Sequence, residues 1–432
     1  METPSTPWTL RCVDTGTSYS GLDVRYRSDT GETLDVVHDF ASIEGTIDLA
    51  TFDRRLASRE PVDRSGVWRF RELILPVGVD IPVTKPEGNT NLYYSDAIAR
   101  YVGLDSFGLK HEGENPTGSF KDRGMTVGVT VAQMLGMRRV ACASTGNTSA
   151  SMAAYAAQAG MQAFVFVPEG KIAYGKLSQA LAYGATTIQL AGDFDRAMQL
   201  VQEVCASEGI YLLNSVNPFR IEGQKAIGFE LLQDLHWAVP DWIVLPGGNL
   251  GNNAALSKGM MELLDLGLID RLPRIAVIQA AGANPLYRAF RDGTAVEPLA
   301  KAETLATAIR IGDPVSWRKS QRGIAASNGV VEEVTDQEIL DAKAHVDAAG
   351  IGAEPASCTT VAGARKLVAA GTIRTTDRVC GILTGHLLKD SDTVIGYHRG
   401  ELEGFDTRFA NAPIRAPAEL GAILDLVRSF DS

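Results

Sequence analysis

From about residue 104 onward, the chain alternates short apolar segments with longer segments of helical periodicity. Residues 163–167, for example, form an apolar run closed by Pro168, and the helical stretch at 174–183 ends at Gly184. This alternation is typical of parallel strands that are buried on both faces and joined by helices. It predicts an α/β fold with mostly parallel sheets and helices on both faces. The predicted strands are 139–143, 163–167, 187–190, 211–213, 242–245, 275–280 and 379–383, and the predicted helices are 148–158, 174–183, 193–207, 221–236, 253–264, 338–349 and 359–370.

The first 80 residues or so differ from this pattern because they are polar and rich in turn signals. Asp14-Thr15-Gly16 and Ser28-Asp29-Thr30-Gly31 mark turns between short strands. We expect residues 1–80 to form a small, mostly β extension, followed by a linker at about residues 76–86. The chain has 432 residues, 45% of them hydrophobic and 22% charged. It therefore has enough apolar residues for a sizeable core and enough length for two or three domains.

Charge and composition exclude several classes of function. A net charge of −11 argues against nucleic acid or an anionic membrane surface as the main partner. No run approaches the ~18 apolar residues of a membrane span, and no segment has the order of a signal peptide. We therefore expect a cytoplasmic protein. Its scattered cysteines contain no CxxC pair and predict neither a disulfide framework nor a metal site; they are Cys12, Cys142, Cys205, Cys358 and Cys380.

Lys121 is the first candidate for chemistry. It stands between the turn signal Asn115-Pro116 and an apolar helical run, flanked by Ser119 and Asp122. A lysine that is buried by its surroundings loses its proton more easily and becomes a nucleophile toward a carbonyl carbon. Enzymes that use pyridoxal 5'-phosphate (PLP) hold their cofactor through such a lysine. The loop around Lys121 therefore predicts covalent binding of this cofactor.

Two loops that follow predicted strands are candidates for anion binding, since ligands bind beyond the carboxyl ends of parallel strands. Residues 144–149, Ser-Thr-Gly-Asn-Thr-Ser, open a helix whose N–H groups favour a carboxylate, or they are a plain helix cap. Residues 246–253, Pro-Gly-Gly-Asn-Leu-Gly-Asn-Asn, have the strand-to-helix context of a phosphate cradle. The second loop is neither a P-loop nor a clean GxGxxG motif.

Two further loops carry polar side chains after apolar strands. Residues 214–220 bring Asn214, Ser215 and Arg220 together, and the guanidinium suits a second oxyanion. A polar turn is the alternative for this segment. In the second loop, the Thr384 hydroxyl is suited to bond a ring nitrogen, and His386 is either a base or a structural histidine.

Together, these loops resemble the fold-type II family of PLP-dependent enzymes. Residues 112–124 resemble the family's lysine motif, and the loops at 144–149, 247–252 and 384–390 follow in the family's order. Residues 214–225 and 306–312 resemble the branch that makes L-threonine. The resemblance covers about residues 80–400. It implies a two-domain fold of the tryptophan synthase β type, in which residues 81–432 form a catalytic region of two α/β subdomains and the smaller spans roughly 125–215.

The resemblance also implies a role for each candidate residue. Lys121 would bind PLP covalently and, with Thr145, act in catalysis. Asn147 would hold the 3'-oxygen of the cofactor, and Thr384 would hydrogen-bond its pyridine nitrogen. The cofactor phosphate would be bound by Gly248, Asn249, Leu250, Gly251 and Asn252. The substrate would be bound by Ser144, Thr148, Asn214, Ser215 and Arg220.

The implied reaction converts O-phospho-L-homoserine and water into L-threonine and phosphate by β,γ-elimination and replacement. A homodimer is expected. Alternatives are another phospho-amino-acid lyase or replacement enzyme, such as a cysteate synthase that uses phosphoserine and sulfite, and a PLP-binding protein without catalysis. The chain departs from the family twice. Relatives often carry paired cysteines of a zinc ribbon in an N-terminal extension, where this chain has Cys12 alone, and Leu387 stands where glycine is common.

Overall fold

The computed structural model describes residues 7–430 except 44, 46, 77–81, 170–173 and 192–193, so part of the predicted linker lies outside the described residues. Its central element is a six-stranded sheet, called the large sheet below. Five of its strands are parallel, and β4 at one edge is antiparallel to its neighbour. The spatial order is β12 (Val330–Val334), β11 (Arg274–Ala280), β10 (Trp242–Pro246), β13 (Val379–Leu383), β5 (Phe107–His111) and β4 (Leu92–Tyr94).

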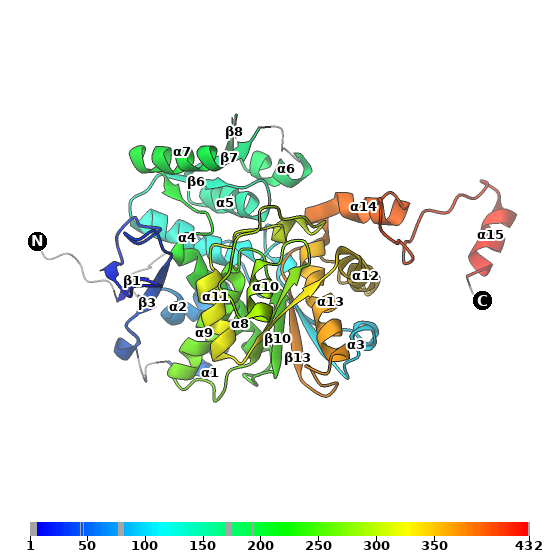
Figure 1. Ribbon diagram of the computed structural model, residues 1–432, viewed down its shortest axis with the longest axis horizontal. Helices are drawn as coiled ribbons and strands as arrows, with labels where there is room; N and C mark the ends of the chain where they lie inside the picture. Colours follow the sequence, from blue (N-terminus) through cyan, green and yellow to red (C-terminus); the bar gives the residue numbers. More distant parts are fainter. Residues whose placement is uncertain are drawn as a thin grey trace, which may run out of the picture. The chain divides into compact units, whose positions relative to one another are not determined.

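The large sheet is buried on both faces, as its apolar strands predict. In β10, the side chains of Ile243 and Leu245 belong to one apolar cluster, and those of Trp242 and Val244 belong to another. The first cluster includes α8 (Pro218–Asp234) and α9 (Gly251–Asp265), and the second includes α13 (Pro355–Ala369) and α3 (Asp96–Val102). Figure 1 shows these helix pairs on opposite sides of β10 and β13.

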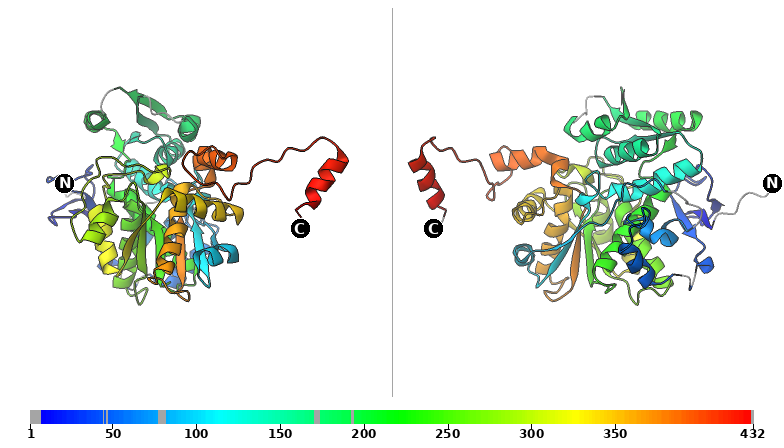
Figure 2. Two further views of the ribbon diagram at one scale, coloured as in Figure 1. Left: turned by 45° about the vertical axis from the view of Figure 1, so that its right-hand side comes forward. Right: turned by 180° about the vertical axis from the view of Figure 1, so that it is seen from behind.

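A second, four-stranded parallel sheet, called the small sheet below, is formed by consecutive βα units. Its order is β8 (Thr186–Leu190), β7 (Gln162–Pro168), β6 (Arg139–Ala143) and β9 (Tyr211–Leu212). The helices α5 (Asn147–Gln158), α6 (Tyr174–Ala182) and α7 (Phe194–Ser207) accompany it. Helix α4 (Lys121–Met134) runs between this layer and the helices of the large sheet (Figure 2).

The N-terminal part forms a three-stranded antiparallel sheet of order β2 (Ser18–Ser20), β1 (Trp8–Cys12) and β3 (Leu34–His38). Strand β1 alternates buried and exposed residues, which places Trp8, Leu10 and Cys12 in the core. Two helices follow it, α1 (Leu49–Leu56) and α2 (Arg71–Ile74). Later in the chain, the α-helices not yet introduced before residue 391 are α10 (Pro285–Asp292), α11 (Trp317–Ala326) and α12 (Asp336–Ala348).

The chain divides into two compact units, Met1–Asp390 and Ser391–Ser432. The second holds α14 (Ser391–Arg399) and α15 (Leu420–Arg428). Among the described residues, the helices are too short or too polar to cross a membrane. The α/β prediction is confirmed by both parallel sheets. The boundary near residue 80 and the smaller subdomain at roughly 125–215 stay predictions.

Two helices that line the site begin earlier than the sequence pattern predicts. Helix α8 begins at Pro218 rather than at residue 221, and α13 begins at Pro355 rather than at residue 359. Both start with proline, which lacks an N–H and has a φ angle suited to the first helical position. In each helix the apolar periodicity begins only after the first turn, so the sequence pattern does not predict that turn. Two side chains at the start of α13, described below, are therefore not predicted either.

Candidate active site

Lys121 is the first residue of α4, and the loop before it is joined to the loop after β13. The N–H of Phe120 donates a hydrogen bond to the carbonyl oxygen of Thr384 at 3.0 Å. An antiparallel bridge pairs Ser119 with Gly385. These backbone contacts bring together Lys121 and Thr384, which the sequence places 263 residues apart.

The Lys121 side chain is only partly exposed. Its Nζ lies 4.3 Å from the centre of the Phe120 ring. Burial lowers the pKa of Lys121 to about 7, and the guanidinium of Arg220 acts in the same direction, whereas the Glu354 carboxylate opposes them. A substantial fraction of this amine is therefore uncharged near neutral pH, which is the state required of a nucleophile.

Arg220 lies near Lys121 because α4 and α8 cross with their backbones in contact. A Cβ at Gly223 would stand 1.9 Å from the carbonyl oxygen of Arg123, and a Cβ at Gly124 would stand 2.6 Å from that of Arg220. Lys121 and Arg220 each precede their helix's glycine by three residues, so each lies on the face of its helix that meets the other. The close approach of the helices at Gly124 and Gly223 therefore sets the separation of the Lys121 and Arg220 side chains.

The Arg220 guanidinium is buried, with 2% of the residue exposed. Its Nη1 donates to the carbonyl oxygen of Leu213 at 3.0 Å, and its Nε has no hydrogen-bond partner. Burial lowers the pKa of Arg220 to about 10. In the part of the chain that the structure describes, no carboxylate forms an ion pair with it. A buried cation of this kind is costly unless an anion joins it, so the position is suited to an anionic ligand.

Helix α5 presents its N-terminus to the same region. It begins at Asn147, and no side chain caps it. The hydroxyls of Ser144, Thr145 and Thr148 are on partly exposed residues, and Ser144 Oγ accepts only the Gly146 N–H, at 3.2 Å. The plain-cap alternative for this loop is therefore wrong, and the uncapped N-terminus favours an anion.

Asn214, Ser215 and Asn249 join the loops after β9, β6 and β10. Asn214 Oδ1 accepts the N–H of Ala143 at 2.9 Å. Ser215 Oγ accepts from Asn249 Nδ2 at 2.9 Å, and Asn249 Oδ1 accepts the N–H of Val315 at 2.7 Å. The two asparagine side chains thus fix the positions of the loops.

The glycine-rich loop at 247–252 follows β10 and starts α9. Leu250 has a φ of +63°, and no side chain caps the helix. Asn252 is buried, and neither polar atom of its side chain has a hydrogen-bond partner. An uncapped helix N-terminus beside an unsatisfied buried amide has the features of an anion-binding site.

Two side chains at the start of α13 support this site, and the sequence pattern does not predict them. Ser357 Oγ accepts the N–H of Gly385 and lies 2.9 Å from Thr384 Oγ1. The Glu354 carboxylate accepts from Asn147 Nδ2 at 3.1 and 3.3 Å. The Glu354-Pro355 pair was the available signal, because proline favours the first position of a helix.

The geometry agrees with comparisons against known proteins. A family model described as pyridoxal-phosphate dependent enzyme matches residues 83–385. The chain belongs to the pyridoxal-phosphate dependent enzymes. Within this family it belongs to the threonine synthases. It is 49% identical to the threonine synthase of Methanosarcina acetivorans, over 89% of this chain and 93% of the relative. It is 45% identical to that of Methanocaldococcus jannaschii, over 89% and 94%.

A further relative supports the assignment, and two solved structures show the same fold. Threonine synthase 2, chloroplastic, of Arabidopsis thaliana is 40% identical over 96% of this chain and 82% of the relative. The fold is similar to that of processed threonine deaminase isoform 2 from Solanum lycopersicum, with a TM-score of 0.60 and 18% identity over 79% and 90% of the two chains. Maize serine racemase gives a TM-score of 0.59 at 20% identity, over 78% and 94%. The predicted fold class and PLP cofactor are confirmed.

The residues of this pyridoxal-phosphate dependent enzyme fit the cofactor. Lys121 supplies an amine of lowered pKa. The uncapped start of α9 and the unpartnered amide of Asn252 would hold the phosphate. Thr384 would face the ring nitrogen, and Asn147 would reach the ring oxygen. These individual roles stay predictions.

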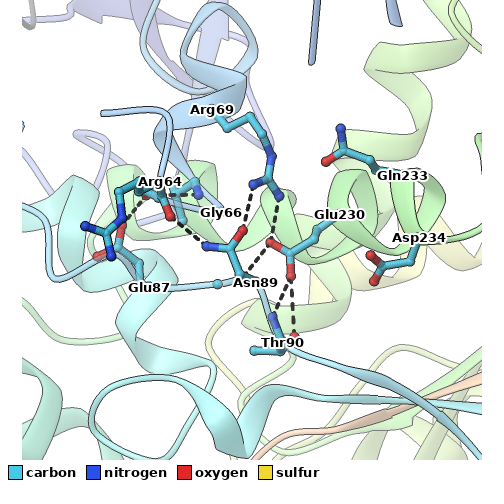
Figure 3. A network of polar contacts seen from close by, with 12 residues as sticks. Arg64, Gly66, Arg69, Glu87, Asn89, Thr90, Glu230, Gln233 and Asp234 are labelled. Carbon is cyan, nitrogen blue, oxygen red and sulfur yellow. Dashed lines mark hydrogen bonds and ion pairs between the residues drawn. The ribbon is translucent and has the colours of Figure 1, made fainter. Parts of the chain in front are cut away.

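A buried ionic network centred on Glu230 supports the Lys121 loop. The Glu230 carboxylate of α8 accepts from Arg69 at 3.1 Å and from the N–H groups of Asn89 and Thr90 (Figure 3). It also accepts from Arg123 at 2.8 Å. Although burial opposes its charge, Arg123 and neighbouring cations hold the pKa of Glu230 well below its ordinary value. Since Arg123 lies two residues after Lys121 and Arg69 belongs to the N-terminal part, the network connects that part to the cofactor lysine.

Proposed function

We propose that this site converts O-phospho-L-homoserine and water into L-threonine and phosphate. The observation that carries the proposal is the buried Arg220 guanidinium, which lies near Lys121 and has no carboxylate partner in the described part of the chain. A phosphorylated substrate supplies the missing anion. A substrate without phosphate would leave this cation buried and unpaired.

The substrate's two anionic ends would be bound by different elements. The uncapped N-terminus of α5, with the hydroxyls of Ser144, Thr145 and Thr148, suits the carboxylate. Arg220 suits the phosphate, because a guanidinium donates two parallel hydrogen bonds to phosphate oxygens. Arg220 would also stabilise the charge that develops on the leaving phosphate.

Proton transfer is the role proposed for Lys121. Bound PLP supplies an electron sink for negative charge on the substrate's carbons. Once the substrate has displaced it, the Lys121 amine accepts the Cα proton, and a pKa of about 7 suits a group that must both take and return protons. Loss of a Cβ proton next supplies the electron pair that forms the Cβ–Cγ double bond and expels phosphate from Cγ. Lys121 then delivers a proton to Cγ, and after water has added its oxygen at Cβ a proton returns to Cα.

Donation of a hydrogen bond to the pyridine nitrogen is the role proposed for Thr384. Ser357 Oγ already accepts the Gly385 N–H. Ser357 Oγ and Thr384 Oγ1 lie 2.9 Å apart and either hydroxyl can donate in this pair, of which we take Ser357 as the donor. Thr384 then keeps its own proton for the ring nitrogen. A hydroxyl donor leaves that nitrogen neutral, which favours elimination and replacement over transamination.

The test is product analysis with purified, PLP-loaded protein. Incubation with O-phospho-L-homoserine should release phosphate and L-threonine in equal amounts, and phosphoserine with sulfite should give no cysteate. The reverse preference would support the cysteate synthase alternative and refute the proposal. Cofactor binding without turnover of either substrate would support a non-catalytic protein. The homodimer and the cytoplasmic location also stay predictions.

A further inference from the structure

Glu354 is a buried carboxylate that the proposed reaction leaves without a role. It precedes the first turn of α13, is 4% exposed, and does not cap its own helix. It lies against the backbone of Gly385, where a Cβ would stand 2.4 Å from Glu354 Oε1. Among the described residues, Asn147 is the one side chain that donates hydrogen bonds to this carboxylate.

The contact connects the two layers of the enzyme at the cofactor site. Asn147 is the first residue of α5 and belongs to the small-sheet layer, whereas Glu354 belongs to α13 and the large sheet. An asparagine amide can turn over and exchange its N–H₂ and carbonyl ends. An ionised carboxylate only accepts hydrogen bonds, so it selects the orientation in which the N–H₂ group of Asn147 faces it.

We propose that Glu354 is a positioning residue for the cofactor. Its carboxylate takes one N–H of Asn147 and thereby leaves the second N–H directed at the ring oxygen of PLP. Without Glu354, the amide is free to turn its carbonyl oxygen toward that ring oxygen, where two acceptors repel each other. The inference rests on the proposed site, and it adds the group that sets the Asn147 orientation.

The surroundings of Glu354 shift its pKa in both directions, and the net shift is upward. Burial raises the pKa of Glu354, and Asp390 acts in the same direction, whereas the Asn147 hydrogen bond and the ammonium groups of Lys389 and Lys121 lower it. These groups come from α4, α5 and the short helix Leu387–Asp390, which surround the carboxylate. Lys389 also donates to Gln179 of α6, a second contact between the two layers.

A double-mutant cycle on the holoenzyme tests the proposal without substrate. Glu354→Met removes both oxygens at similar length, Glu354→Gln keeps one acceptor but adds a donor, and Asn147→Ala removes the amide. The readouts are the visible absorption band of the bound cofactor and its dissociation constant. We expect Glu354→Met and Asn147→Ala each to weaken cofactor binding about tenfold and to shift the band alike, as for the loss of one hydrogen bond.

The double-mutant cycle distinguishes positioning of Asn147 by Glu354 from a general contribution of Glu354 to the folded structure. The double variant should bind the cofactor no more weakly than Asn147→Ala alone, and Glu354→Gln should fall between wild type and Glu354→Met. Additive losses, or an unchanged band in Glu354→Met, would overturn the proposal. Should Glu354→Met fail to fold, a Glu354→Gln band that matches wild type would overturn it equally. If wild-type holoenzyme binds PLP but does not turn over O-phospho-L-homoserine, the proposed function fails while this cycle stays interpretable.

Discussion

Replacing Arg220 with methionine should make the protein more stable and the enzyme less active. Burial lowers the Arg220 pKa to about 10. This corresponds to roughly 3 kcal/mol against the charged form, at about 1.4 kcal/mol for each pH unit. Loss of the hydrogen bond to the Leu213 carbonyl oxygen offsets about 1 kcal/mol of this gain in stability. Methionine keeps most of the aliphatic packing, so the substrate-free protein should gain roughly 1–2 kcal/mol, or a few degrees in Tm.

The activity changes in the opposite direction because the phosphate loses its cation. Two charge-assisted hydrogen bonds contribute about 1.5–3 kcal/mol each. Their loss should lower kcat/KM by roughly 10²–10⁴-fold, since about 1.4 kcal/mol changes a rate tenfold. Phosphate release from O-phospho-L-homoserine measures this, and calorimetry measures Tm.

The matched control is Arg138→Met, which removes an exposed arginine and should change neither quantity. The cofactor band should also be retained in Arg220→Met. The reasoning is refuted if Arg220→Met keeps kcat/KM within about threefold of wild type, or if it loses stability instead of gaining it. Either result would mean that the Arg220 guanidinium is not an unpaired cation that binds the substrate.

Three further predictions follow from the same contacts. Cofactor loading onto PLP-free protein should accelerate as pH rises to about 7 and then level off, because Lys121 must be uncharged to react; a profile still rising above pH 9 would contradict this. Gly385→Ala should weaken PLP retention, measured by dialysis, because its Cβ would displace the Glu354 carboxylate, and unchanged retention would count against that contact. Glu230→Gln should cost about 3–5 kcal/mol in urea denaturation, since it removes the ion-pair partner of buried Arg69 among the described residues and one of the two carboxylate partners of Arg123 and of Lys110; a loss below about 1 kcal/mol would contradict the network.

The sequence predicts the site well where one rule applies: loops after parallel strands meet at one edge of a sheet. Residues 144–148, 214–220, 247–252 and Thr384 all follow strands, and hydrogen bonds join their loops. Strand β5 escaped prediction because it carries Lys110 and His111 among apolar residues. The buried ammonium of Lys110 is paired with Glu230 at 2.8 Å and Asp234 at 2.6 Å, and neither partner is near it in the sequence.

The supporting residues were beyond prediction for a related reason. Arg69 reaches Glu230 across 161 residues, and Asn147 reaches Glu354 across 207. Polar contacts of such long range depend on the finished fold, whereas strands and helices follow from local periodicity. Even so, the glutamate before Pro355 was visible as an acidic residue at a helix start. Its position beside the site follows only from the structure, in which α13 begins at Pro355.

The most direct test of the proposed reaction is the fate of the water oxygen. Holoenzyme is given O-phospho-L-homoserine in H₂¹⁸O, and both products are examined by mass spectrometry. Elimination of phosphate followed by water addition at Cβ predicts ¹⁸O in the hydroxyl group of L-threonine and unlabelled phosphate. Labelled phosphate together with L-homoserine would show that water attacks phosphorus, and would contradict the account.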